Sequence, residues 1–321
     1  MKNGTGGLIK SSPVELAREN INLLILIVMI IIGSLVSKQF LTLQNWQNIS
    51  RQIAVNGILS VGVTLVFLAG GFDLSIAGTL SLCGCLAVGL QSSMPIPLAV
   101  FISIFVGSLM GALNGILLKI TRGDLSETFL ITLGTQLVGS SLALTYTSGR
   151  SLFTTRGSSY DFFGRGTIMG FPFSAIILIS LMIILQFVLS KTSYGRKIYL
   201  TGGNKAAAFL SGINVSAIKI SVFTFAGFCA AVAGVVSSSR GGTAVYTMGN
   251  GTDFDACIAV LIGGNVLGGG KGGMFQTLIG VVIYGLISNI LNLATVPPPV
   301  QTMLKGTLLL LAILLNGLKR K

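Results

Sequence analysis

Histidine is absent from this 321-residue chain, and charged residues make up only 9% of it. Without histidine the sequence lacks the side chain that acts most often as a general base, so it offers no candidate catalytic triad. The cysteines lie in apolar segments without zinc-binding spacing, and they are Cys83, Cys85, Cys229 and Cys257. We therefore expect the chain to be neither an enzyme nor a metal-binding protein.

The shortage of charge also excludes an ordinary soluble domain, which carries about 25% charged residues. The uncharged intervals are long enough to cross a hydrocarbon core that needs about 20 helical residues. We predict an all-α polytopic membrane protein with about ten transmembrane segments, some of them broken or re-entrant. The predicted segments are 21–37, 52–70, 74–91, 96–118, 127–147, 172–190, 216–236, 254–269, 273–294 and 299–316.

The positive charges indicate how these segments are oriented. The net charge of +13 comes from Lys and Arg scattered through short loops, which is not a nucleic-acid-binding pattern. Most of them face the cytoplasm if both termini are inside, so the positive-inside rule predicts an N-in, C-in topology. The predicted parts are a cytoplasmic tail 1–20, one transmembrane domain 21–318 with an outer loop 148–171 and an inner loop 191–215, and a cytoplasmic end 319–321.

Two glycines and a carboxylate interrupt the apolar sequence after the second segment. This stretch, GGFDLS, consists of Gly70, Gly71, Phe72, Asp73, Leu74 and Ser75. Backbone can leave the helical conformation at membrane depth only where protein or a water-filled cavity satisfies its polar groups. We expect Asp73 to be the N-cap of a helix that begins at Leu74. The same break, with Ser75, is also a candidate for the lining of a polar pathway, and the two interpretations are compatible.

A second candidate break lies in the other half of the chain, in GTDFDACIAVLIGGNVLGGGKGG. Asp253 and Asp255 stand at the start of a short apolar segment, 254–269, which either spans the bilayer or re-enters it. Glycine clusters follow, and we add Gly263, Gly264 and Asn265 to the candidate pathway residues. Lys305, seven residues into the last segment, can reach the outer interface or pair with an acid such as Asp255. We expect it to extend to the interface.

Paired, glycine-interrupted segments in two halves of a chain indicate the substrate path of a transporter. The sequences GSLMGALNGIL (107–117) and GVVIYGLISNIL (280–291) each follow a broken segment and suggest a weak internal repeat. Chance similarity between glycine-rich apolar segments is the alternative explanation. The small-residue spacing of Gly107, Gly111 and Gly115 predicts close helix packing.

The inner loop contains GGNKAAAFLSGIN, which predicts a short helix over 204–212. Asn204 can cap its start, and Gly212 suits the left-handed position after its end. Phe209 and Leu210 are an exposed apolar pair on this helix and need a surface that covers them. That surface is either the lipid headgroups or a motor subunit to which the helix couples. The candidate coupling residues are Gly203, Asn204, Lys205, Ala206, Phe209, Leu210, Ser211 and Gly212.

Three stretches, GGFDLS, GGNKAAAFLSGIN and DFDACIAVLIGGNVLGGGKG, together resemble the permeases of ATP-binding-cassette (ABC) importers for ribose, xylose and similar simple sugars. The resemblance runs from about residue 45 to the C-terminus. Phe72 stands where the family usually has isoleucine, and the outer loop 148–171 contains no family motif.

The resemblance implies a permease subunit in the bacterial inner membrane that imports a small neutral sugar by alternating access. It also implies a homodimer, a cytoplasmic ATPase partner and an extracytoplasmic sugar-binding protein. The chain lacks a Gly-x-x-x-x-Gly-Lys-Ser/Thr phosphate loop, so ATP and Mg²⁺ are expected on the ATPase, with no cofactor in this chain.

Three alternatives remain open at the level of sequence. One is an ion-coupled secondary carrier with Asp73 or Asp255 as its ion site. Another is an ABC permease for a different small solute, such as a nucleoside or an amino acid. The last is an interaction protein or receptor anchor without transport, for which broken helices serve no purpose.

Overall fold

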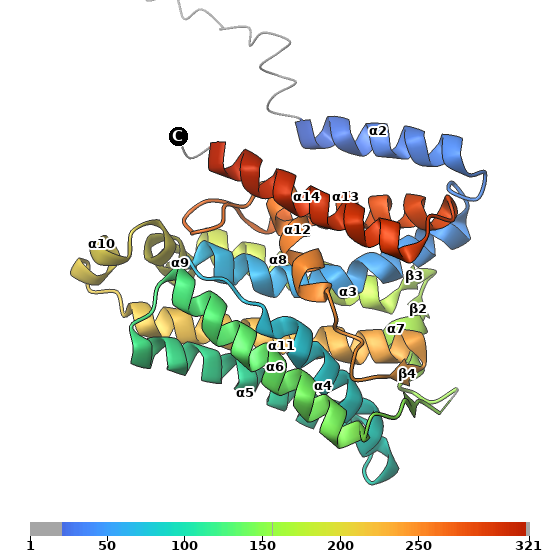
Figure 1. The fold of residues 1–321 in the computed structure, drawn as a ribbon, viewed down its shortest axis with the longest axis horizontal. Helices are drawn as coiled ribbons and strands as arrows, with labels where there is room; N and C mark the ends of the chain where they lie inside the picture. Colours follow the sequence, from blue (N-terminus) through green and yellow to red (C-terminus); the bar gives the residue numbers. More distant parts are fainter. Residues whose placement is uncertain (1–20, 156, 319–321) are drawn as a thin grey trace, which may run out of the picture.

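The chain forms a bundle of helices in the computed structural model, which describes residues 21–155 and 157–318 (Figure 1). Side chains are described there except at 21–23, 312, 313 and 315–318. The predicted tails, 1–20 and 319–321, and Arg156 lie outside the described residues. The helices are α2 (Ile21–Val36), α3 (Leu43–Leu68), α4 (Ser75–Gly89) with a 3-10 turn (Leu90–Ser92), α5 (Ile96–Thr121), α6 (Leu125–Thr147), α7 (Asp161–Arg165), α8 (Phe173–Lys191), α9 (Ser193–Gly203), α10 (Lys205–Leu210), α11 (Val215–Gly241), α12 (Thr252–Ile262), α13 (Met274–Leu293) and α14 (Pro298–Leu318).

Long apolar helices dominate the structure, which confirms the predicted all-α polytopic class. Within the described residues, seven helices are long and apolar enough to cross a membrane: α3, α4 with its 3-10 turn, α5, α6, α8, α11 and α13. Each of the ten predicted segments coincides with a helix. The segment 254–269 is the exception in length, because its helix, α12, has only 11 residues.

The helices form an inner group and an outer group. In α3 and α11, 78% and 61% of the most apolar stretch is buried, whereas in α6 and α8 the shares are 22% and 28%. Exposed Leu, Ile and Phe side chains cover the outer helices. This distribution suits α6 and α8 to contact with lipid and leaves α3 and α11 as the core.

The central contact joins α5 to α11 through small residues, as predicted. A Cβ atom built on Gly107 would lie 2.6 Å from Ala231 Cβ, and one on Gly115 would lie 2.5 Å from the Cα of Ile220. Gly111 packs in the same way against the backbone of Phe223. Larger side chains at these positions would force the two backbones apart, which is why glycine recurs at this spacing.

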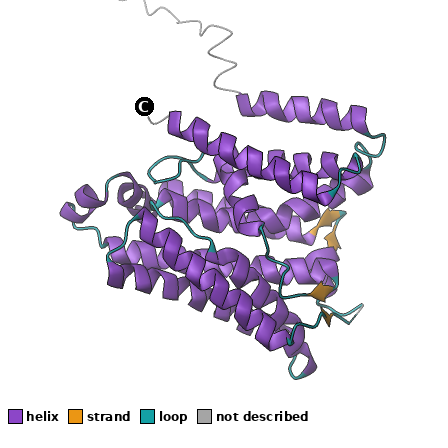
Figure 2. Ribbon diagram, in the orientation of Figure 1, coloured by secondary structure: helices purple, strands orange, loops and turns teal. Residues whose placement is uncertain are grey.

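Short strands mark one end of the bundle, and α9 and α10 mark the other (Figure 2). We call these the outer and inner ends, following the predicted orientation, which stays a prediction. The strands form two antiparallel pairs, β1 (Leu152–Phe153) with β4 (Thr243–Ala244) and β2 (Thr167–Ile168) with β3 (Phe171–Pro172). Tyr160, in the segment between β1 and β2, is fully buried against α11, with its hydroxyl 2.6 Å from Ser238 Oγ. The outer loop is therefore packed onto the bundle.

The inner loop 191–215 contains two helices where we predicted one. The predicted short helix is present as α10, and α9 precedes it. The side chain of Thr192 accepts a hydrogen bond from the backbone N–H of Gly195, which caps α9. The sequence analysis missed this helix because its segment, SYGRKIYLTGG, is rich in residues with weak helix propensity.

Candidate translocation site

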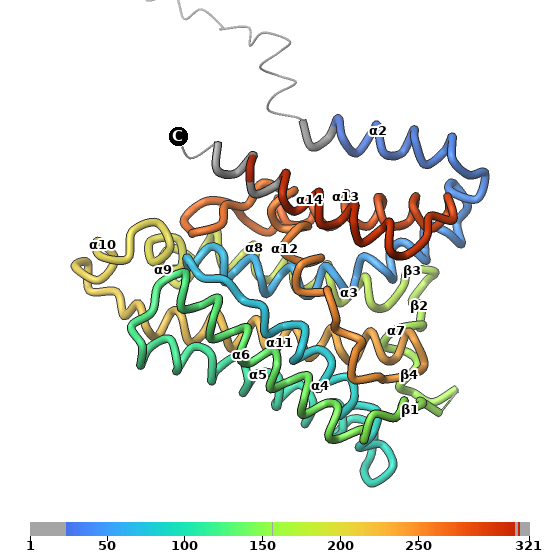
Figure 3. The backbone as a smooth tube through the Cα atoms, viewed as in Figure 1, coloured from blue at the N-terminus to red at the C-terminus, as the bar shows by residue number. Residues whose placement is uncertain are grey.

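Two helices, α4 and α12, begin inside the bundle and not at one of its ends. α3 ends at Leu68 near α9, and residues 69–74 then lead back into the interior, where α4 begins (Figure 3). The chain also enters the interior after β4, and α12 starts there with Thr252. The structure thus contains a break at both positions where the sequence predicted one.

Asp73 organises the start of α4. Its side chain is fully buried, and its Oδ1 accepts hydrogen bonds from the backbone N–H of Ser75 (2.9 Å) and from the Ser75 hydroxyl (2.6 Å). Asn114 of α5 donates to the same hydroxyl at 2.8 Å. The helix begins at Ser75 and Leu74 is its cap residue, so the predicted N-cap position of Asp73 was wrong by one residue. The carboxylate still accepts from the first helical amide.

The peripheral helix α6 satisfies the backbone of this break. The backbone N–H of Phe72 donates to Thr128 Oγ1, and that of Leu74 donates to Thr132 Oγ1, both at 3.2 Å. The Phe72 ring contacts the ring of Phe129, also on α6, with centroids 5.9 Å apart. These contacts explain how irregular backbone is tolerated within the bundle.

The first turn of α12 meets the first turn of α4 beside the same helix. Asp253 is 1% exposed, and its Oδ2 accepts a hydrogen bond from Gln136 Nε2 of α6 at 3.3 Å. Asp253 also lies close enough to Asp73 for the two carboxyl groups to interact electrostatically. The backbone N–H of Gly249 donates to Ser81 Oγ of α4 at 2.9 Å, which joins the two breaks a second time.

Asp255 occupies the other side of the same turn of α12. Its Oδ2 forms an ion pair with Lys305 Nζ of α14 at 2.9 Å, and that ammonium lies 5.5 Å from the centroid of the Tyr284 ring. The expectation that Lys305 extends to the interface was therefore wrong. A carboxylate within reach offers the ammonium a partner at its own depth, so the long side chain has no need to reach water.

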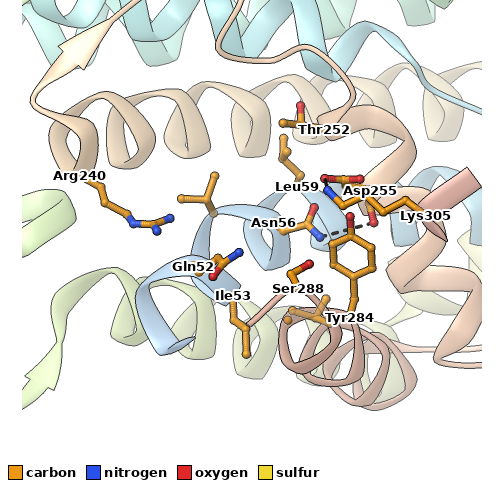
Figure 4. Close-up of a pocket in the computed structure, with 13 residues that line it drawn as sticks. Gln52, Ile53, Asn56, Leu59, Arg240, Thr252, Asp255, Tyr284, Ser288 and Lys305 are labelled. Carbon is orange, nitrogen blue, oxygen red and sulfur yellow. Dashed lines mark hydrogen bonds and ion pairs between the residues drawn. The ribbon is translucent and has the colours of Figure 1, made fainter. Parts of the chain in front are cut away.

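This ion pair borders a cavity of about 140 Å³ between α3, α11, α12, α13 and α14 (Figure 4). Arg240 approaches from one side and the Asp255–Lys305 pair from the other, with Gln52 and Asn56 of α3 between them. Pockets for drug-sized ligands measure about 300–1,000 Å³. The cavity therefore suits a small solute, and its polar lining is unusual for the interior of a membrane helix bundle.

The glycine-rich loop 263–273 closes the inner side of α12 and does not line the cavity. Asn265 is fully buried; its Oδ1 accepts from the backbone N–H of Gly273 at 2.8 Å and its Nδ2 donates to Thr277 Oγ1 at 3.1 Å. The predicted pathway residues Gly263, Gly264 and Asn265 thus fold the loop back to α13. The segment 254–269 forms the half-helix α12, which starts inside the bundle, and continues into this loop at the inner end.

At the inner end, three glycine-containing segments meet. A Cβ atom on Gly70 would lie 3.3 Å from the Cα of Gly202 at the end of α9, and one on Gly202 would lie 2.9 Å from the Cα of Gly269. The backbone N–H of Gly270 donates to the carbonyl of Leu68 at 3.1 Å. We call these contacts the glycine junction (Leu68–Gly70, Gly202 and Gly269–Gly270). It places the inner loop directly against the first break and against the loop that follows α12.

Helix α10 projects from this junction with the predicted local structure. Asn204 Oδ1 accepts from the backbone N–H of Ala207 at 2.9 Å, and Gly212 has the expected left-handed backbone, with φ of +76°. Gly203 and Ala206 lie at its start, and Ser211 ends it. Phe209 and Leu210 are 71% and 85% exposed.

Lys205, at the start of α10, reaches the start of α6. Its Nζ forms an ion pair with Asp124 Oδ1 at 2.5 Å and donates to the carbonyl of Arg122 at 3.3 Å. Asp124 is the cap of α6, where it forms a capping box with Glu127. The hydrogen bond from Lys205 lowers the pKa of the Asp124 carboxyl below its ordinary value. The inner loop is therefore tied to the helix that holds both breaks.

The sequence analysis missed several residues of this arrangement, chiefly Gln52, Asn56, Gln136, Arg240 and Tyr284. A signal for some of them was present. Gln52 and Asn56 are four residues apart in an otherwise apolar segment, and that spacing places them on one face of a helix. Gln136 is likewise an amide inside an apolar segment. Polar side chains inside membrane segments usually face the bundle interior.

A family model described as the permease component of branched-chain amino acid transport systems matches residues 45–313. The chain belongs to this family. The matched region begins in α3 and ends in α14, so it includes both breaks, the inner loop and all helices around the cavity. The permease is therefore related to the family from α3 to α14, a region that leaves out α2.

The permease is also similar to proteins that are named as sugar permeases. It is 40% identical to the ribose import permease protein RbsC of Bacillus subtilis over 297 residues, 92% of this chain and 91% of the relative. It is 37% identical to RbsC of Escherichia coli K12 over 308 residues, 94% of each chain. The D-allose transport system permease protein AlsC of E. coli K12 is 35% identical over 299 residues, 92% of this chain and 90% of the relative.

No solved structure matches the permease. The sequence relatives confirm the predicted resemblance to ABC-importer permeases of the ribose and xylose type. Together with the apolar helices, they show a multi-pass protein of the bacterial inner membrane.

Proposed function

We propose that the permease passes a small neutral sugar across the membrane in an ATP-driven importer by alternating access. The names of its relatives, which are ribose, allose and xylose permeases, support this class of substrate. The observation that carries the mechanism is the glycine junction, where the inner loop contacts the first break and the loop that follows α12. A movement of the inner loop would therefore act on α4 and α12 at once.

The path of that movement follows the contacts from α10 inwards. Force on α10 reaches Gly70 and Gly269 through Gly202, and it reaches α6 through the Lys205–Asp124 ion pair. Further along, α6 holds the first break and the Gln136–Asp253 hydrogen bond. Two-state motion of α6 and the breaks would open the cavity alternately to the two sides of the membrane.

The partners follow from the same surfaces. We propose that Phe209 and Leu210 dock onto a cytoplasmic ATPase, because an exposed apolar pair on a short helix needs cover. ATP and Mg²⁺ would bind to that ATPase, and this chain would bind no cofactor. Two copies of the permease would form the pathway. An extracytoplasmic sugar-binding protein would contact the outer loop, where Arg150 and Arg165 offer positive charge.

A secondary carrier is the main competing function, since buried carboxyl groups are typical of ion-coupled transporters. Asp73 Oδ2 and Asp253 Oδ1 are buried without a hydrogen-bond partner among the described residues. Such a carrier would work without an ATPase. Purification of the permease from its native membrane in mild detergent separates the two functions, because near-stoichiometric recovery of an ATPase supports only the importer.

The coupling role of α10 is tested by changing Phe209 and Leu210 to Asp in the complete transporter reconstituted in vesicles. We expect loss of ATP hydrolysis stimulated by the sugar-loaded binding protein, and loss of uptake, with an unchanged unfolding temperature of the permease. Leu41→Asp is the matched control, because Leu41 is 63% exposed in the loop between α2 and α3 and lies in neither proposed docking segment. Normal stimulated hydrolysis in the double variant would exclude α10 as the docking helix.

A further inference from the structure

We infer that the cavity beside the Asp255–Lys305 pair is a transit site for a neutral polyol, with Asn56 and Tyr284 exchanging hydrogen bonds with sugar hydroxyls. The inference rests on the proposed function for its substrate class. The cavity itself is defined by the structure alone, between α3, α11, α12, α13 and α14.

The strongest support is a pair of polar atoms that lack partners. Asn56 Oδ1 is buried without a hydrogen bond from any described residue, although its Nδ2 donates to the carbonyl of Asp255 at 3.4 Å. The hydroxyl of Tyr284 lies near Asp255 and Ser288, in a geometry that completes no hydrogen bond with either. Leaving such groups unsatisfied in a buried site is unfavourable, because they have lost their hydrogen bonds to water without a replacement.

An occupant that satisfies both atoms must donate to the amide oxygen and exchange a hydrogen bond with the phenol. A hydroxyl group does both, since it carries one donor and two acceptor lone pairs. A sugar presents several hydroxyls on neighbouring carbons, so one molecule can meet Asn56 and Tyr284 together. The walls around them also include apolar carbons from Ile53 and Leu59, which suit the faces of a sugar ring.

The lining carries one acidic group and two basic ones, of which Asp255 and Lys305 form a pair. Asp255 and Lys305 neutralise each other on one wall, at 2.9 Å. Arg240 stands on the opposite wall at the outer end of α11, where its guanidinium can donate to hydroxyls. The amide and phenol groups between these walls carry no charge. An anion would gain from Arg240 but would face the carboxylate of Asp255, so an anionic sugar is the sharpest competing ligand.

The position of the cavity links occupancy to the breaks. Asp255 lines it, and Asp253, two residues earlier on α12, faces Gln136 and Asp73. A ligand that binds beside Asp255 therefore contacts the first turn of α12. The same turn contacts α4 and α6 through Asp253. The cavity volume, about 140 Å³, admits a small solute only.

The test uses the whole transporter in vesicles, with Gln52→Cys as a reporter thiol in the cavity lining. The native cysteines are buried, so a maleimide applied from the outer side labels the introduced cysteine at position 52 and not the native ones. The rate of labelling is measured against D-ribose concentration, with D-ribose 5-phosphate as the anionic probe. We expect D-ribose to slow the labelling and the phosphate to have little effect.

Asn56→Leu and Tyr284→Phe each remove one proposed hydrogen bond. Each should raise the half-protecting concentration of D-ribose about 3- to 10-fold, the equivalent of one net hydrogen bond. The matched controls are Asn289→Leu and Tyr160→Phe, whose side chains bond to Asn45 and Ser238 away from the cavity. These should leave the half-protecting concentration unchanged.

The outcomes separate this inference from the proposed function. Labelling that D-ribose does not slow, with ATP-driven uptake intact, would mean a cavity that holds only water and would overturn the inference. Stronger protection by D-ribose 5-phosphate would overturn it in favour of an anion site. Absence of ATP-driven uptake in the unsubstituted transporter would instead count against the proposed function, whatever the labelling shows.

Discussion

Helices α4 and α12 both begin inside the bundle beside acidic residues. Asp73 precedes α4, and Asp253 and Asp255 lie in the first turn of α12, but the surroundings of these acids differ. The carboxyl group of Asp73 is fully buried and accepts a hydrogen bond from the backbone N–H of Ser75. On α12, Asp253 is enclosed in the same way, but Asp255 faces the cavity and Lys305. The start of α4 is therefore enclosed by protein on all sides. The start of α12 contacts α6 on one side through Asp253 and lines the cavity on the other through Asp255.

The two half-helices also run in opposite directions from their meeting point. α4 leads to the outer end, whereas α12 leads to the loop 263–273, which contacts Gly202 at the inner end (Figure 1). Opposite half-helices at the centre of a bundle are typical of transporters built from inverted repeats. The weak sequence repeat itself stays a prediction.

The largest effect should come from Asp73→Leu, which tests whether the start of α4 is a structural joint. It leaves the backbone N–H and the hydroxyl of Ser75 without their buried acceptor, so we expect about 2–4 kcal/mol of lost stability. Asp73→Asn keeps one acceptor oxygen and should lose less. Thermal unfolding in detergent measures both, and equal losses would contradict the capping role.

A smaller effect is expected where α12 faces the cavity. Lys305→Met leaves Asp255 without its counter-charge in a half-buried site and should cost about 1–3 kcal/mol. Adding Asp255→Asn should recover part of that loss. A double-mutant cycle of unfolding free energies gives the coupling, and additive losses would mean that the ion pair contributes nothing.

The hydrogen bond between α6 and α12 gives a third test of the comparison. Gln136→Leu removes the donor to Asp253 and should cost about 1–2 kcal/mol, because the carboxyl group stays buried. Uptake should fall further than stability alone explains, since α6 would no longer hold α12. The control is Thr145→Ala on an exposed part of α6; equal uptake in both variants would exclude this link.

The smallest effect concerns the inner end and depends on pH. Lys205 lowers the pKa of Asp124, so the stability from this pair is complete above the unfolded-state pKa of about 3.9 and is lost as pH falls through the lowered folded-state value. The pair is exposed and contributes less than about 1 kcal/mol. Lys205→Ala should therefore reduce the unfolding temperature more at pH 6 than at pH 3; a pH-independent difference would exclude the ion pair as its cause.

Several local features could be predicted from the sequence. Hydropathy located the ten helical segments, glycine and acidic residues located both breaks, and the Asn204–Gly212 pattern located α10. These features depend on short-range physics, namely the burial preference of consecutive residues, cap hydrogen bonds and left-handed glycines. Such interactions involve neighbours in the chain, so the sequence by itself determined them.

The tertiary structure alone decided which groups meet. Asp253 and Asp255 are two residues apart, yet the rotation of α12 turns one towards Gln136 and the other towards Lys305. The cavity joins Asn56, Arg240 and Tyr284 from three helices. Their meeting depends on the packing angles and rotations of whole helices, which many distant contacts set together. No local pattern contains that information, and for this reason the polyol site became visible only in the folded chain.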